Sequence, residues 1–273
     1  MKERVTSAAT LVLFIAAIVV FNHSFPLALN IAIALVSVLG VYEIILAIGL
    51  LKNPVLVLPS LLFAAVYPFL ETDLGRETAY FSYTVILFAA LLFYHSFLTF
   101  REVGVVYSMS LLIPTALGTL LGLRRLGGAH GMFYVLIAIF SAWISDMGGF
   151  FAGRMFGHRK FCPDISPKKT VEGVFGSFAF SLTAIFLAGL IFNSLNFADG
   201  ARVSYLSLFL IGVFGTVLSI LGDLSFSLIK RCCHIKDFGE IIPGHGGILD
   251  RFDSVIFEAP FVYLLARFLP IVQ

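Results

Sequence analysis

Charge is what this sequence has least of. Asp, Glu, Lys and Arg make up only 12% of the 273 residues, whereas 59% are hydrophobic, and the mean hydropathy is +1.01. A soluble domain needs more polar side chains to cover its surface, so the composition excludes that class. The formal net charge is only +2. Because a nucleic-acid-binding surface is strongly basic, we expect no nucleic-acid partner.

Cysteine is also scarce, and strict alternation of apolar and polar residues is absent. The three cysteines are Cys162, Cys232 and Cys233, and the adjacent pair lacks the spacing of a metal site. We expect them to take no part in the chemistry. Apolar stretches without period-two alternation argue against a transmembrane β-barrel.

Long apolar runs are what the sequence has instead. Runs of roughly 18 or more apolar residues are long enough to cross a bilayer. They predict an all-α, polytopic integral membrane protein with about nine transmembrane helices. The expected spans are 6–22, 27–51, 54–70, 79–100, 104–123, 132–153, 171–192, 204–229 and 252–270. We interpret the first as a helix and not as a signal peptide, because no small-residue cleavage site follows it.

The basic residues predict the orientation. If the N-terminus is cytoplasmic, most of the 18 Lys and Arg residues lie on the cytoplasmic side, as the positive-inside rule requires. The two most basic loops, 154–169 and 230–251, then face the cytoplasm. We therefore expect a multi-pass protein of the cell (inner) membrane with its active site on the cytoplasmic face.

The chain divides by composition into two parts. Residues 1–125 are expected to form a scaffold of transmembrane helices, and residues 126–273 a catalytic transmembrane region. Glu43 interrupts the second span and is the one acid buried in the first part. A structural role for Glu43 is favoured over contact with a substrate.

Two acids interrupt spans of the second part. Asp146 lies toward the end of the sixth span and Asp223 well inside the eighth. A charged residue deep in a span costs about 2.5–3.5 kcal/mol on insertion scales, so it usually faces a partner or a water-filled cavity. Asp223 shares a helix face with Ser227 and Lys230, at i, i+4 and i+7. A simple pairing with a basic residue of a neighbouring helix is the alternative for each acid.

The face of the sixth span that carries Asp146 also carries Gly149 and Gly153. Glycines at such spacing let another backbone or a ligand approach closely. Helix packing alone would explain them equally well.

The loop "PDISPKKTVEG" (163–173) predicts an anion site. Ser166 followed by Pro167 suggests an N-cap and a first helical position. Lys168 and Lys169 would then open a helix whose N-terminus is already partly positive, which is unfavourable without an anion. A phosphate bound by free N–H groups, both lysines and the hydroxyls of Ser166 and Thr170 would resolve the conflict. The alternative is that the lysines only anchor the membrane boundary.

The segment "PGHGGILDRFD" (243–253) predicts a second part of the site. Its glycines permit a tight turn with outward-facing N–H groups, a nest suited to anions, and His245 lies inside the turn. Asp250 and Asp253 follow it at i and i+3. Carboxylates beside cations and a glycine turn suggest Mg²⁺ together with a polyphosphate. The cations that bracket the segment are Lys230, Arg231, Lys236 and Arg251.

Residues 227–253, "SLIKRCCHIKDFGEIIPGHGGILDRFD", resemble the signature of the CDP-diacylglycerol synthases, or phosphatidate cytidylyltransferases. That pattern has Ser, Lys-Arg, Lys-Asp, Pro-x-His-Gly-Gly and Asp-Arg-x-Asp at fixed spacings, and each position is filled here. The "SPKKTVEG" loop and the end of the sixth span are also similar to the family. The resemblance covers about residues 141–260.

The resemblance implies that CTP and phosphatidate, a lipid of the bilayer, react to give CDP-diacylglycerol and pyrophosphate. It implies dependence on Mg²⁺, with room for a second cation, and it allows a homodimer. The metal ligands would be Asp223 and Asp250. These two acids, His245 and Lys230 would be the catalytic residues. The expected substrate-binding residues are Ser166, Lys168, Lys169, Thr170, Arg231, Lys236, Asp237, Gly246, Gly247, Arg251 and Asp146.

The sequence departs from the family pattern at four positions. Phe226 stands where members usually carry Glu, which puts any second metal position in doubt. His234 and Phe238 replace small residues, and Met147 replaces a hydroxyl-bearing residue. None of these changes removes the pair Asp223 and Asp250.

Two alternatives remain. A cytidylyltransferase that acts on another lipid phosphate would have the same cytoplasmic site. An ion-coupled secondary transporter would use Asp146 and Asp223 as ion sites, but it would explain neither the clustered cations nor the His-Gly-Gly turn, and the sequence shows no inverted repeat.

Overall fold

The computed structural model describes residues 25–195, 200–239 and 246–273. The first expected span, 6–22, and His245 lie outside these residues. In chain order the helices are α2 (Ala28–Ala47), α3 (Pro54–Val66), α4 (Asp73–Phe93), α5 (Phe100–Leu126), α6 (Gly131–Phe156), α7 (Val171–Leu195), α8 (Tyr205–Leu210), α9 (Thr216–Cys232) and α10 (Leu249–Phe268). The short turns Tyr67–Phe69 and Gly128–His130 are 3₁₀-helical, and Ile211–Gly215 is π-helical. The strands β1 (Lys160–Cys162) and β2 (Ser166–Thr170) form one antiparallel hairpin.

The apolar runs form helices, as predicted. Each of the eight expected spans within the described residues coincides with at least one helix. Five helical segments in this part of the chain are long and apolar enough to cross a bilayer: Ala28–Ala47, Phe100–Leu126, Gly128–Phe156, Val171–Leu195 and Tyr205–Cys232. The protein is therefore an all-α membrane protein, apart from the β1–β2 hairpin. The number of nine spans and the cytoplasmic N-terminus stay predictions.

The chain folds into two compact units. The first comprises Met1–Gly118 and Cys233–Arg251, and the second comprises Thr119–Cys232 and Phe252–Gln273. The segment that carries the glycine turn thus belongs with the N-terminal helices. The division at residue 125 rests on composition and stays an interpretation.

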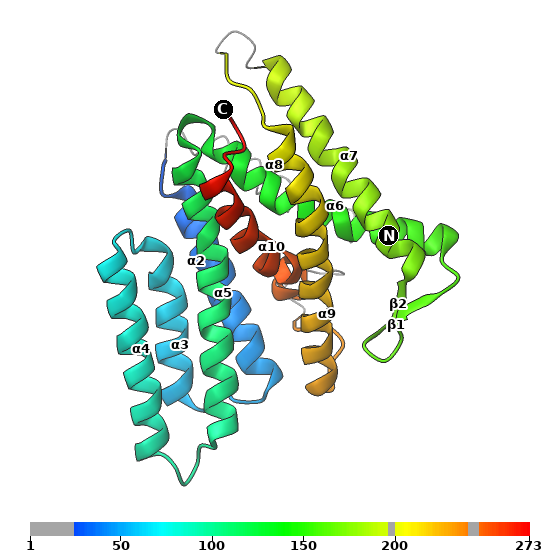
Figure 1. Cartoon of the computed structure of the whole chain (residues 1–273). Helices are drawn as coiled ribbons and strands as arrows, with labels where there is room; N and C mark the ends of the chain where they lie inside the picture. Colours follow the sequence, from blue (N-terminus) through cyan, green and yellow to red (C-terminus); the bar gives the residue numbers. More distant parts are fainter. Residues whose placement is uncertain (1–24, 196–199, 240–245) are drawn as a thin grey trace. The chain divides into compact units, whose positions relative to one another are not determined.

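Aromatic and hydroxyl side chains hold the helices of the first unit together. Figure 1 draws the ribbons of these helices. Tyr83 of α4 stacks on Phe63 of α3, with ring centroids 4.7 Å apart, and on Tyr107 of α5 at 5.9 Å. The Tyr83 hydroxyl also forms a hydrogen bond of 2.9 Å with the Ser60 hydroxyl. Pairing these polar atoms removes the cost of burying them in an apolar interior.

Glycines bring α6 and α7 of the second unit into close contact, and the β1–β2 hairpin joins the two helices (Figure 1). A Cβ added at Gly176 would lie 2.2 Å from the Ala152 Cβ and 2.8 Å from the Gly148 carbonyl oxygen. One added at Gly173 would lie 2.7 Å from the Gly149 carbonyl oxygen. The hairpin is thereby carried on a closely packed helix pair.

Gly176→Ala is therefore expected to destabilise the protein by about 1–3 kcal/mol, because the new methyl group has no room. The midpoint of thermal unfolding should fall by roughly 2–4 °C per kcal/mol in detergent. Gly104→Ala is the matched control, since a Cβ on this glycine of α5 meets nothing within 4 Å. An unchanged midpoint in Gly176→Ala would show that the two helices do not depend on this contact.

Candidate active site

The two lysines of "SPKKT" lie in a strand, so the prediction that they open a helix was wrong. Residues Ser166–Thr170 form β2, and α7 begins at Val171. The reason is a second capping residue. The Thr170 Oγ1 accepts a hydrogen bond of 3.1 Å from the Gly173 N–H, which is the pattern of an N-cap. Pairing of β2 with β1, with Lys160 opposite Thr170, then extends the preceding residues.

This correction changes the argument for an anion site. Neither lysine lies within α7, so the argument that they open the helix against its dipole no longer applies. Thr170 is buried and its hydroxyl caps the helix, and Ser166 lies at the start of the strand. What remains is a hairpin that presents Lys168, which is exposed, and Lys169, which is half-buried.

Glu172 fixes the base of this hairpin to the first turn of α7. Its Oε2 accepts a hydrogen bond of 3.1 Å from the His158 N–H, and its carboxylate accepts the Arg159 N–H at 3.3 Å. The Val171 N–H donates to the Arg159 carbonyl oxygen at 2.9 Å. These contacts fix the base of the hairpin that carries the two lysines.

A cavity of about 420 Å³ lies between the hairpin and helices α6, α7 and α9 of the second unit. This volume is within the range of small-molecule sites. Its lining includes four cations and two acids: Arg154, Lys160, Lys168, Lys169, Asp146 and Asp223. Ammonium and guanidinium groups are the usual partners of phosphate oxygens, so the cavity suits a phosphate-bearing ligand.

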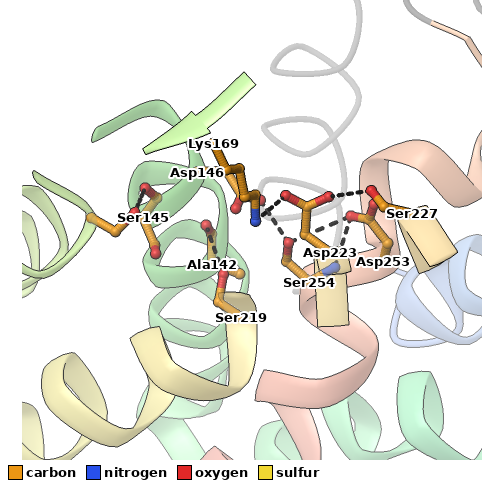
Figure 2. Close-up of polar contacts among 10 residues, drawn as sticks. Ala142, Ser145, Asp146, Lys169, Ser219, Asp223, Ser227, Asp253 and Ser254 are labelled. Carbon is orange, nitrogen blue, oxygen red and sulfur yellow. Dashed lines mark hydrogen bonds and ion pairs between the residues drawn. The ribbon is translucent and has the colours of Figure 1, made fainter. Parts of the chain in front are cut away.

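Asp223 of α9 is the centre of the polar contacts in the cavity (Figure 2). The Lys169 Nζ lies 2.5 Å from its Oδ2, and the Ser227 Oγ donates to its Oδ1 at 3.3 Å. The predicted shared face of Asp223 and Ser227 is therefore confirmed. About a quarter of the Asp223 side chain is exposed, so the carboxylate remains accessible from the cavity. Lys230, two turns further along α9, is buried.

Asp146 of α6 lines the same cavity, together with Gly149 and Gly153. The predicted common face of these three residues is confirmed. The Ser254 Oγ of α10 donates to the Asp146 Oδ2 at 2.6 Å. A Cβ added at Gly153 would lie 2.9 Å from the Thr170 Oγ1, so this glycine leaves room for the hairpin and its cap.

Asp253 of α10 is a buried acid whose neighbours come from other helices, and the sequence alone does not identify them. It is 6% exposed, and its Oδ1 accepts a hydrogen bond of 2.8 Å from the Ser254 N–H. Its carboxylate interacts electrostatically with Asp223, Asp146 and Lys230. Figure 2 shows Asp253 beside Asp223, on the opposite side from Lys169.

The glycine turn belongs to the first unit. Gly246 has φ +84°, a conformation that L side chains rarely adopt, so glycine suits this position. Gly244 and His245 of the predicted turn lie outside the described residues, so the turn as a whole stays a prediction. The Oδ2 of Asp250, in the first turn of α10, accepts hydrogen bonds from the Phe238 N–H at 2.9 Å and the Gly247 N–H at 3.0 Å. Lys236 and Asp237 nearby are exposed, and Arg251 is half-buried.

The carboxylates of Asp223 and Asp250 are each of a kind that can bind Mg²⁺ together with substrate oxygens. No group of three or more His, Cys, Asp or Glu side chains within the described ranges is arranged to hold a metal ion. Mg²⁺ is commonly held by one or two carboxylates together with substrate phosphate oxygens, and does not need a cage of protein ligands. Asp223 and Asp250 belong to different units, so their shared ligation of one ion stays a prediction.

The structure describes the conformation or contacts of two residues that depart from the family pattern, Phe226 and His234. Phe226 is fully buried in the second unit, and its ring meets that of Phe257 edge-on, with centroids 6.4 Å apart. The position where the family usually carries Glu therefore makes an apolar contact here. His234 has φ +57°, a left-handed conformation that costs a non-glycine residue on the order of 1–2 kcal/mol.

Two cavity residues, Arg154 and Lys160, were not singled out from the sequence. Arg154 could have been found, because it lies eight positions after Asp146 on the same helix face. Lys160 could not, because it reaches the cavity only through the strand register that places it opposite Thr170.

Helices that can cross a bilayer, and a cavity with four cations around two carboxylates, define a membrane protein equipped for phosphate chemistry. Comparison with known proteins makes this specific. A profile of the cytidylyltransferase family matches residues 2–269. The chain therefore belongs to the cytidylyltransferase family, and it is a nucleotidyltransferase.

Curated relatives agree with the family. The chain is 37% identical over 220 residues to the phosphatidate cytidylyltransferase of Bacillus subtilis (strain 168), which covers 80% of this chain and 77% of the relative. It is 42% identical over 133 residues to the enzyme of the same name from Aquifex aeolicus, covering 49% of this chain and 47% of the relative. It is 38% identical over 162 residues to the Haemophilus influenzae enzyme of this name, covering 57% of this chain and 54% of the relative.

Proposed function

We propose that this protein is a phosphatidate cytidylyltransferase, which converts CTP and phosphatidate into CDP-diacylglycerol and pyrophosphate in phospholipid biosynthesis. The observation that carries the proposal is the cavity in the second unit, where Lys160, Lys168 and Lys169 face two carboxylates. Relatives that bear this enzyme name support the choice of substrates.

The chemistry needs no nucleophile from the protein. A phosphate oxygen of phosphatidate attacks the α-phosphorus of CTP and forms a new P–O bond. The bond from the α-phosphorus to the bridging oxygen breaks, and its electron pair leaves with pyrophosphate. Both reactants are anions that repel each other, so the protein must hold them in line and neutralise their charge. The basic residues of the cavity supply that neutralisation.

Mg²⁺ would be held by Asp223 and Asp250, and a second cation is compatible with the proposal. When bound, the ion supplies further neutralisation of the triphosphate. Lys169 holds the Asp223 carboxylate in the cavity and can reach a phosphate. His245 would orient a substrate, since the phosphate of phosphatidate is largely ionised at neutral pH. The remaining proposed contacts to substrate come from Lys230, Arg231, Lys236, Asp237, Gly246, Gly247 and Arg251.

Lys168→Ala and Lys169→Ala should each lower kcat/KM for CTP or phosphatidate by about 10–100-fold. Each variant loses a charge-assisted phosphate contact of roughly 1.5–3 kcal/mol. Lys169→Ala should cost more, because it also leaves Asp223 without this ion pair. Lys52→Ala, an exposed lysine between α2 and α3, is the control for simple loss of charge. Unchanged kinetics in both hairpin variants would reduce these lysines to membrane anchors.

We place the site on the cytoplasmic side of the cell (inner) membrane. Cys162 ends β1, in the hairpin that lines the cavity, and offers a probe. In a chain carrying Cys232→Ser and Cys233→Ser, an impermeant thiol reagent should label Cys162 in inside-out vesicles and spare it in right-side-out ones. The opposite pattern would reverse the topology. Formation of a homodimer remains a prediction.

The experiment that tests the proposed substrate is a comparison of lipid phosphates. Purified protein with radiolabelled CTP and Mg²⁺ should label phosphatidate far better than an isoprenoid or ether-lipid phosphate. If the protein prefers another lipid phosphate, it is still a cytidylyltransferase, but phosphatidate is not its substrate. Ion-driven uptake into proteoliposomes without nucleotide turnover would instead support the transporter alternative.

A further inference from the structure

We infer that Glu43, in the N-terminal helices, is a positioning residue for the proposed reaction: it fixes the backbone of residues 247–249 at the start of α10, the helix whose first turn carries Asp250. This inference rests on the proposed function for its kinetic part. It assigns an active-site role to a part of the chain that the sequence marks only as scaffold.

The first observation is the pair of hydrogen bonds that the Glu43 carboxylate accepts. Glu43 is fully buried in α2. Its Oε1 accepts the Ile248 N–H at 2.9 Å, and its Oε2 accepts the Leu249 N–H at 2.8 Å. Both oxygens thus bind consecutive backbone donors where α10 begins. A carboxylate there satisfies N–H groups that have no acceptor within the helix and interacts favourably with the helix dipole.

The second observation explains two glycines of the segment 227–253. A Cβ added at Gly247 would lie 2.5 Å from the Glu43 Oε2, and one added at Gly239 would lie 2.7 Å from the Oε1. Any side chain at either position would displace the carboxylate. Because both glycines leave space for Glu43, the turn and the buried acid are complementary in shape.

The third observation connects Glu43 to Asp250. The Gly247 N–H, next to the donors that Glu43 binds, donates to the Asp250 Oδ2, and so does the Phe238 N–H. The backbone of residues 247–249 is therefore held by two carboxylates, one buried and one half-exposed. Loosening the Glu43 contacts would free the backbone that sets the direction of the Asp250 carboxylate.

The decisive variant is Glu43→Gln. Gln keeps the size but turns one acceptor into an amide donor, which would face a backbone N–H. We expect the Mg²⁺ concentration for half-maximal activity to rise by roughly 10–100-fold, the effect typical of losing a group that orients a metal ligand. High Mg²⁺ should restore much of kcat. Amide hydrogen exchange of segment 246–250 should accelerate, whereas exchange in α4 should not.

Asn30→Ala is the matched control, because Asn30 is also a buried polar residue of α2, and its Nδ2 donates to the Pro68 carbonyl oxygen at 2.7 Å. It should lower stability without changing the Mg²⁺ dependence. If Glu43→Gln does not fold, Glu43→Asp keeps the charge and should give a smaller shift in the same direction. Wild-type exchange of segment 246–250 in a folded Glu43 variant, or an equal Mg²⁺ shift in Asn30→Ala, would overturn the inference. The exchange measurement is independent of turnover, so an inactive wild-type protein would defeat the proposed function alone.

Discussion

Asp223→Asn is expected to reduce kcat by about 10²–10³-fold or more, the loss typical of removing one group that stabilises charge in a transition state. Asn has the size of Asp but not the charge that Mg²⁺ requires. The Lys169 ammonium would also lose its partner at 2.5 Å. The measurement is kcat at saturating CTP and phosphatidate, across a range of Mg²⁺ concentrations.

Ser227→Ala is the matched control for Asp223. It removes only the donor at 3.3 Å from the Asp223 Oδ1 and leaves the carboxylate charged, so its effect should stay within a few-fold. If Asp223→Asn retains activity close to that of Ser227→Ala, the Asp223 charge has no part in the reaction.

Asp250→Asn should reduce kcat by a similar factor, about 10²–10³-fold or more, and here the structure separates two roles of one side chain. Both backbone donors, Phe238 and Gly247, bind the same oxygen, Oδ2. Asn can keep this oxygen and replace only the other by an amide nitrogen. The turn should therefore persist while the charge for the metal is lost. Asp250→Ala removes both roles and should additionally accelerate hydrogen exchange of segment 246–250.

The combination of the two asparagine variants tests whether they serve one ion. If Asp223 and Asp250 hold the same Mg²⁺, either change empties the site, and the double variant should be little worse than each single variant. Losses that multiply would show that the two carboxylates act separately. Retained turnover in Asp250→Asn would leave Asp250 with the role of holding the turn.

The helices could be predicted because apolar run length is a local property of the sequence. The start of α7 could not, because "SPKKT" contains two residues able to cap a helix. Ser166 followed by Pro167 has the stronger local signature. Thr170 prevails because the preceding residues gain strand pairing with Lys160–Cys162, a tertiary contact that the spacing of residues does not reveal.

In the candidate site, too, local patterns could be predicted from the sequence and tertiary contacts could not. The common face of Asp223 and Ser227 follows from helical periodicity, and the structure confirms it. The partners of Glu43 are 205 and 206 positions away in the chain, so no local pattern identifies them. The neighbours of Asp253 likewise come from other helices. Sequence predicted which residues carry charge, and tertiary packing decides which of them meet.

The most direct test of the central claim follows the phosphates of CTP through the reaction. Purified protein would be given phosphatidate, Mg²⁺ and CTP labelled at either the α- or the γ-phosphate. We predict that the α-label enters the lipid fraction as CDP-diacylglycerol, that the γ-label leaves as pyrophosphate, and that the two amounts are equal. Transfer of the γ-label to lipid, or release of pyrophosphate without labelled lipid, would contradict a cytidylyltransferase acting on phosphatidate.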